Sequence, residues 1–281
     1  MNRLFVKEKT EEKKPCFRIG VTGTGHRTGV SMVASSLALW SAEQGYSVSY
    51  TECWDPGRLG SSVYEGAGFE KRFPNGNFQD VFHAVRGNRI LPPGCNQTKG
   101  VLWKIHTPEG LEEGKSPADS ERAWIIASDR REVQILDLDT LHGSGWREYL
   151  DWCDWIFAVL DPLPSRLLIE KEQIQFLKRI EIERKEAERQ RGPKQDRHAR
   201  GRAPSGFFLG KKHPGFTWIV NFMNAGVGRK MVQRLLRSTD ILWIPAFPAQ
   251  IFYENEYYCK FYFENNMIHK EIVKILENTG I

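Results

Sequence analysis

The stretch that most constrains the fold is a glycine-rich turn at residues 20–31, which reads Gly-Val-Thr-Gly-Thr-Gly-His-Arg-Thr-Gly-Val-Ser. It follows an apolar run at 17–21 and precedes a run at 32–40 whose residues are typical of an amphipathic helix. A second strand is predicted at 47–51 and stops at Glu52. A strand, a glycine loop, a helix and a strand in this order place an anion at the N-terminus of the helix. Glycines let the backbone approach a phosphate, and the N–H groups of the first helical turn are free to donate to it.

The loop fits the P-loop pattern G-x-x-x-x-G-K-[ST] only in part. Five residues separate Gly23 from Gly29, one more than the pattern allows, and Val30 stands where the lysine belongs. Ser31 alone matches the end of the pattern.

The dinucleotide pattern G-x-G-x-x-G also fits in part. Gly23 and Gly25 match it, Thr28 replaces the third glycine, and Glu52 is the acidic residue that would accept a hydrogen bond from a ribose. A glycine loop that only closes a strand-to-helix turn is the third interpretation. The local pattern leaves all three open.

Composition indicates a globular protein that is able to bury a large core. The chain has 281 residues, 40% of them hydrophobic, with nine Trp and a net charge of +5. No apolar run is long enough for a transmembrane helix, which needs about 18 residues. Residues 1–16 are expected to form a flexible tail, since they are charged and lack the apolar core of a secretion signal. The five Cys form no C-x-x-C pair, which favours reduced thiols in a cytoplasmic protein.

Strands and helices are expected to alternate along the rest of the chain. Further strands are predicted at 101–106, 123–128, 133–139, 155–160, 216–221 and 241–245, and helices at 78–85, from 165 to about 180, at 228–237 and at 268–276. The helix after 165 has an apolar stripe of Leu167, Leu168, Ile174, Leu177 and Ile180. Such alternation predicts a mostly parallel, doubly wound α/β sheet with helices on both faces, forming a single domain over 17–281.

Residues 184–213 interrupt this pattern. They contain ten lysines and arginines against three acidic residues and show no apolar periodicity. We interpret them as a basic, mobile insertion, which is either solvated or in contact with a polyanion such as acidic lipid or nucleic acid.

The order of these features resembles the MinD/ParA-like branch of the P-loop ATPases, over roughly residues 17–250. The matching elements are the loop and small-residue helix Gly29–Ala38, the acidic Glu52 with Asp55-Pro56, the Walker B-like strand Ile135–Asp137, the strand and Pro-rich turn at 154–165, Val220-Asn221, and Ile244-Pro245.

The resemblance implies that the chain binds ATP or ADP with Mg²⁺. It assigns the phosphates to Gly23, Gly25, His26, Arg27, Thr28, Gly29, Val30, Ser31 and Met32, and the base to Asn221 and Pro245. It assigns the metal to Ser31 and Asp137, and catalytic roles to Asp137, Glu52 and Asp55. Asp139 is two residues from Asp137 and therefore points to the same face of the sheet.

The loop departs from the family pattern at two positions that carry charge. Members of this branch have two lysines in K-G-G-x-G-K-[ST], and the corresponding residues are Gly25 and Val30. Since electrostatic stabilisation dominates phosphoryl transfer, a degenerate nucleotide-binding scaffold with weak or no hydrolysis is expected. A weak ATPase that uses Arg27 is a second hypothesis. A dinucleotide-binding oxidoreductase and a partner-binding pseudo-ATPase without nucleotide are the others.

The resemblance also implies self-association across the nucleotide face. The expected partner is a second copy or a related ATPase, on a face that includes Trp54, Arg58 and Trp146. The expected location is the cytoplasm, with peripheral association at the membrane as a further hypothesis.

Overall fold

The computed structural model describes residues 16–53, 63, 67–72, 78–87, 94–107, 119–140, 146–190, 215–238 and 241–277. Eight strands form one sheet in the order β3-β4-β2-β5-β1-β6-β7-β8. Their bounds are β1 Phe17–Gly23, β2 Val48–Glu52, β3 Gln97–Thr98, β4 Val101–Lys104, β5 Val133–Thr140, β6 Trp155–Leu160, β7 Gly215–Met223 and β8 Ile241–Pro245. Only the pairing of β3 with β4 is antiparallel.

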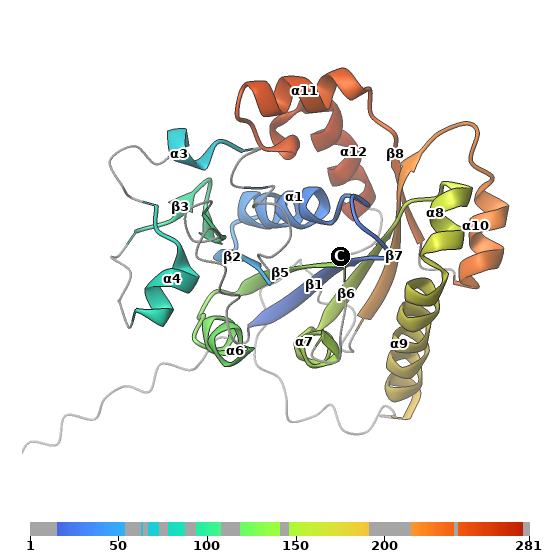
Figure 1. Cartoon of the computed structure of the whole chain (residues 1–281), viewed down its shortest axis with the longest axis horizontal. Helices are drawn as coiled ribbons and strands as arrows, with labels where there is room; N and C mark the ends of the chain where they lie inside the picture. Colours follow the sequence, from blue (N-terminus) through green and yellow to red (C-terminus); the bar gives the residue numbers. More distant parts are fainter. Residues whose placement is uncertain are drawn as a thin grey trace, which may run out of the picture.

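Helices cover both faces of the sheet (Figure 1). One face carries α1 (Val30–Glu43), α11 (Ala249–Tyr257) and α12 (Asn266–Glu277), and the other carries α6 (Asp119–Ala127), α7 (Trp146–Trp152) and α9 (Lys171–Gln190). The remaining helices are α3 (Phe69–Arg72), α4 (Val81–Arg86), α8 (Pro164–Ile169), α10 (Arg229–Leu236) and the 3₁₀ turn η1 (Tyr262–Glu264). The doubly wound, mostly parallel sheet predicted from sequence is confirmed. No helix among the described residues is both long and apolar enough to span a bilayer.

The central strands are buried from both sides, as their apolar runs predicted. Every residue of β6 is buried, because alternate side chains enter the two apolar clusters that lie above and below the sheet. Near the C-terminus, between residues 252 and 263, four aromatic residues extend the first cluster: Phe252, Phe261, Tyr262 and Phe263. The Phe261 ring stacks on Trp103 of β4, with 4.7 Å between ring centroids.

The strand expected at 123–128 is wrong, because these residues belong to helix α6. Ile125 and Ile126 are both buried, whereas Trp124 is 60% exposed. A short apolar run does not distinguish a strand from a helix by periodicity alone. Here the helix buries Ile126 against the sheet and Ile125 against α4.

The helix expected from residue 165 onward is two helices, α8 and α9, which meet at Glu170. Leu168, expected on the buried stripe, is 76% exposed, while Ile174, Leu177 and Ile180 are buried as predicted.

Helix α9 also extends into the interval expected to be a mobile insertion. Residues 184–190 are helical, and the side chain of Arg184 is buried. Residues 191–213 lie outside the described part of the chain, as does most of the expected N-terminal tail.

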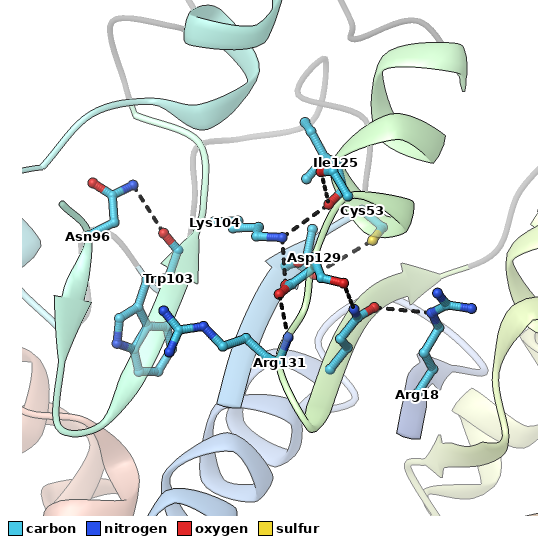
Figure 2. A network of polar contacts seen from close by, with 11 residues as sticks. Arg18, Cys53, Asn96, Trp103, Lys104, Ile125, Asp129 and Arg131 are labelled. Carbon is cyan, nitrogen blue, oxygen red and sulfur yellow. Dashed lines mark hydrogen bonds and ion pairs between the residues drawn. The ribbon is translucent and has the colours of Figure 1, made fainter. Parts of the chain in front are cut away.

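A buried polar network links β4 to the central strands β5 and β1 (Figure 2). Lys104 Nζ donates to Asp129 Oδ2 at 2.6 Å and to the carbonyl of Ile125 at 3.0 Å. The Asp129 carbonyl accepts from Gln134 of β5, whose side chain in turn accepts from Arg18 of β1. Both charges of the Lys104–Asp129 pair are buried, so loss of either partner would leave an uncompensated ion.

Candidate phosphate and metal site

The glycine loop connects β1 to α1 at the carboxyl edge of the parallel sheet, as predicted. The Thr24 N–H donates to the carbonyl of Val159 in β6 and anchors the start of the loop. Gly29 is the N-cap of α1, and its φ of 93° is a left-handed conformation that glycine adopts without strain. Arg27 is also left-handed, with φ of 61°.

The first turn of α1 is available to an anion. Within the described residues, the N–H groups of residues 29–32 donate to no backbone carbonyl. Helix α1 is 14 residues long and has no acidic residue in its first turn. Free N–H groups and the positive end of the helix dipole therefore point at the same place.

Asn221, near the end of β7, stabilises this loop through hydrogen bonds. Its Nδ2 donates to the carbonyl of Thr28 at 2.9 Å, and its Oδ1 accepts from the N–H of Phe222 at 2.9 Å. A Cβ on Gly29 would lie 2.3 Å from Asn221 Nδ2, so the glycine makes this close approach possible. The side chain that the resemblance assigned to adenine is fully buried and bonded to the loop.

Ser31 and Asp137 form the pair from which a metal site would be built. The Ser31 side chain approaches the Asp137 carboxylate at the carboxyl end of β5 closely enough to favour its ionised form. Tyr50 Oη donates to Asp137 Oδ2 at 2.6 Å, and the Asp139 N–H donates to Oδ1 at 3.1 Å. Burial raises the pKa of Asp137 from its usual 3.8 to about 6, although the interactions with Tyr50 and Ser31 favour the ionised form.

This donor set fits Mg²⁺ better than a metal that needs several side chains. The described residues contain no group of three His, Cys, Asp or Glu that could hold a metal ion. Mg²⁺ is commonly bound through one or two protein oxygens, with phosphate oxygens and water completing its shell. Ser31 and Asp137 supply one hydroxyl and one carboxylate to such a shell.

The buried charge of Asp137 is expected to lower the free energy of unfolding by a measurable amount. Asp137→Asn is expected to stabilise the protein above pH 6 and to leave it unchanged near pH 4. The carboxyl binds its proton more tightly when folded, so wild-type stability falls as pH rises from 3.8 to about 6, by about 3 kcal/mol. Urea unfolding of both proteins across this range measures the difference. Asp151→Asn, an exposed control, should show no such pH dependence. A wild-type-to-variant difference independent of pH would contradict the prediction.

Glu52 ends β2 at the carboxyl edge of the sheet, in register with Asp137 of β5. Strand β5 lies between β1 and β2, so β5 and not β2 is the neighbour of the strand that carries the loop. Glu52 is fully buried and its Oε2 accepts from the N–H of His106 at 3.0 Å. Asp55 lies outside the described residues.

The loop side chains do not replace the missing lysines with a buried cation. Val30 is buried in the apolar core, and its Cγ2 lies 2.8 Å from where a Cβ on Gly23 would be. His26 and Arg27 are exposed, whereas Met32 is buried. Arg27 is therefore the permanently charged side chain that the loop itself presents to solvent.

A cavity of about 470 Å³ lies at the carboxyl ends of β7 and β8. Pro245, predicted to meet the base, lines it together with Met223, Asn224, Ala225, Val227, Arg229, Trp243 and Glu271. The Arg229 guanidinium lies over the Trp243 ring at 5.3 Å from its centroid. Because β7 also carries Asn221, this cavity is on the same strand as the support of the phosphate loop.

Sequence reasoning missed two residues that touch this site. Tyr50 contacts Asp137, and the alternation of side chains along β2 is a signal that places Tyr50 and Glu52 on one face. Glu170 contacts the loop at Thr24 from 146 residues away in the chain, and no local pattern indicates that contact.

Comparison with solved structures identifies the fold. MinD, the septum site-determining protein of Pyrococcus horikoshii, complexed with Mg-ADP, is 12% identical with a TM-score of 0.63, over 94% of this chain and 96% of that one. The MinC:MinD complex of Aquifex aeolicus is 13% identical with a TM-score of 0.59, over 94% of this chain and 95% of that one. A Borrelia burgdorferi plasmid partition protein bound to AMPPNP is 12% identical with a TM-score of 0.56, over 94% of this chain and 100% of that one. The chain has the MinD/ParA fold.

At this level of identity the likeness shows the fold alone. No protein-family model and no curated protein sequence matches the chain. The MinD/ParA fold accounts for the position of the glycine loop between β1 and α1 and for Asp137 on the adjacent strand. The chemistry must be argued from the residues at those places.

Proposed function

We propose that this chain is a nucleotide-binding protein of the MinD/ParA type, which binds ATP or ADP with Mg²⁺ and hydrolyses it slowly or not at all. One observation carries the proposal. Free N–H groups at the start of α1 lie beside Ser31, whose side chain approaches the buried Asp137 carboxylate. Backbone donors for phosphate and oxygen ligands for Mg²⁺ thus meet at one end of one helix.

Slow hydrolysis follows from the charges at the loop. Gly25 and Val30 occupy the positions of the two family lysines, and neither brings a cation to a phosphate. Stabilising the charge of the transferring phosphoryl group is most of what such enzymes contribute to catalysis. Arg27 is the alternative cation, and its use would make the protein a weak ATPase.

A scaffold or positioning role is consistent with this chemistry. A protein that binds nucleotide without rapid turnover can switch its affinity for partners while remaining loaded. The similar MinD of Aquifex aeolicus is found in complex with MinC. We extend the proposal to association with a second copy or a related ATPase, and to peripheral contact with a membrane. Trp54 and Arg58, expected on that face, lie outside the described residues, and only the backbone of Trp146 is described.

The oxidoreductase alternative is not favoured. In the dinucleotide-binding fold, the acidic residue that bonds the ribose ends the strand beside the glycine-bearing one. Here β5 separates β1 from β2, and Glu52 is fully buried against His106. A partner-binding protein without nucleotide remains the competing function.

Equilibrium titration with fluorescent ATP, ADP and NAD tests the proposal. ATP and ADP are expected to bind in the presence of Mg²⁺, and NAD is not. Ser31→Ala should reduce the Mg²⁺-dependent part of the affinity about tenfold, the effect of losing one ligand of a weakly held ion. Ser35→Ala, one turn further along α1, is the control, because among the described residues its hydroxyl donates to the Met32 carbonyl of the same helix and to no loop residue.

Two outcomes would count against this function. Failure of ATP and ADP to bind would leave the partner-binding alternative. Preferential binding of NAD would revive the oxidoreductase. Light scattering of the same samples tests association, and a mass that stays monomeric with and without ATP would remove self-association from the proposal.

A further inference from the structure

Glu170 places a carboxylate directly on the phosphate loop. It is the residue between α8 and α9 and is 7% exposed. Thr24 Oγ1 donates to its Oε2 at 2.6 Å. A Cβ built on Gly25 would lie 1.9 Å from Oε1 and 2.2 Å from Cδ. The carboxylate therefore occupies the space that a side chain at residue 25 would need.

This carboxylate is incompletely paired. Its Oε1 is buried and has no hydrogen-bond partner among the described residues. The cation within ion-pair distance is Arg166, whose Nη1 lies 3.8 Å from Oε1 and whose side chain is 38% exposed. A buried carboxylate that leaves one oxygen unbonded costs free energy, so its position on the loop must be maintained by the rest of the fold.

The segment that carries Glu170 is less buried than the central strands of the sheet. Helix α8 contributes no buried residue, and the two residues before Glu170, Leu168 and Ile169, are 76% and 78% exposed. Moving Glu170 off the loop would break its hydrogen bond to Thr24 and shift Leu167, which packs against the core, but it would expose little further apolar surface at Leu168 and Ile169. A charged group in a loosely packed turn contrasts with the fully buried strands on which the loop is built.

We propose that Glu170 is a positioning residue of the phosphate loop whose negative charge also opposes polyphosphate binding. Its hydrogen bond to Thr24 maintains the loop in the conformation described above. Its charge repels the phosphates of a ligand at the N-terminus of α1, and binding is strengthened when the carboxylate leaves the loop or loses its charge. Gly25 is required because any side chain there would displace Glu170. The inference rests on the proposed nucleotide-binding function and concerns the regulation of the same site.

Charge and support can be separated by substitution. Glu170→Gln keeps a carbonyl oxygen for Thr24 and removes the charge, whereas Glu170→Ala removes both. Gly25→Ala keeps the charge but pushes the carboxylate away from the loop. Glu172→Gln is the matched control, because Glu172 is exposed at the start of α9 and contacts no loop residue in the described part of the chain.

The experiment measures the affinities of wild type, the four single variants and the Gly25→Ala/Glu170→Gln double variant for Mg-ATP, Mg-ADP and adenosine. Glu170→Gln should bind Mg-ATP about tenfold more tightly than wild type, the effect of removing one partly screened charge near the phosphates. The gain should be smaller for Mg-ADP and absent for adenosine, since repulsion scales with ligand charge. Gly25→Ala should show the same order of gains, and Glu172→Gln should match wild type. In the Gly25→Ala/Glu170→Gln double variant the gains should not add, because both changes remove the same interaction.

Each result that would contradict the proposal points to a different cause. Equal affinity of wild type and Glu170→Gln would reduce Glu170 to structural support while leaving nucleotide binding intact. A gain of the same size for adenosine would show that charge is not the cause. If none of the proteins binds any of the three ligands, the proposed function and this inference both fail. Gly25→Ala serves as a second variant should Glu170→Gln not fold.

Discussion

Replacing Val30 with lysine is expected to raise the rate of ATP hydrolysis about a hundredfold, with tighter nucleotide binding. Val30 begins α1 at the position where P-loop proteins place the lysine that contacts the phosphates. A charged contact made in the transition state contributes about 3 kcal/mol, which corresponds to about a hundredfold in rate. Single-turnover and steady-state phosphate release, measured beside nucleotide titration, would separate chemistry from binding.

Two features of the structure shape this experiment. Val30 is 4% exposed and belongs to the apolar core, so thermal unfolding must first show that the variant folds. Gln44→Lys is the control, because it adds the same charge at the exposed opposite end of α1. If Val30→Lys folds and neither affinity nor turnover changes, the loop does not bind phosphate as proposed.

Replacing Arg184 with methionine is expected to lower the free energy of unfolding by about 4 kcal/mol. Arg184 of α9 is buried and donates to three backbone carbonyls, those of Leu150, Cys153 (2.9 Å) and Gly215 (3.4 Å). These carbonyls lie at α7, before β6 and at the start of β7, so one guanidinium joins three elements. Burial lowers the pKa of this guanidinium, and its loss would leave the carbonyls without that donor.

Urea unfolding at neutral pH measures this difference. Arg189→Met provides the matched control, since Arg189 is exposed near the end of the same helix. The control should change stability by no more than about 0.5 kcal/mol. Equal effects of the two substitutions would mean that the first turns of the expected basic insertion do not support the fold.

Arg184 also illustrates a limit of sequence interpretation. The composition of residues 184–213 is that of a solvated segment, and nothing local distinguishes Arg184 from the arginines that follow it. Its burial depends on carbonyls in α7, just before β6 and at the start of β7, which come from parts of the chain about 30 residues away on both sides. Average composition describes a segment, whereas burial is decided residue by residue.

The strand predicted at 123–128 failed for a related reason. Ile125 and Ile126 are both buried, and a run of apolar residues is compatible with either a strand or a helix. What separates the two is the packing of Ile125 against α4, a helix almost 40 residues earlier, while Ile126 faces the sheet.

The sequence by itself determined the α/β class, the strands of the central sheet and the location of the glycine loop. These depend on local properties: uniformly apolar runs such as 155–160 must be buried on both sides, and glycines permit the left-handed turn at Gly29. The same local signals placed Asp137 at the end of a strand.

Only the tertiary structure decided which of these residues share a site. The strand order inserts β5 between β1 and β2, which brings Asp137 to Ser31 and leaves Glu52 bonded to His106. It also brings Glu170 onto Thr24 across 146 residues of chain. The physical reason is that periodicity reports which face of an element is buried, whereas the neighbour of each strand is selected by the packing of the whole sheet and its helices.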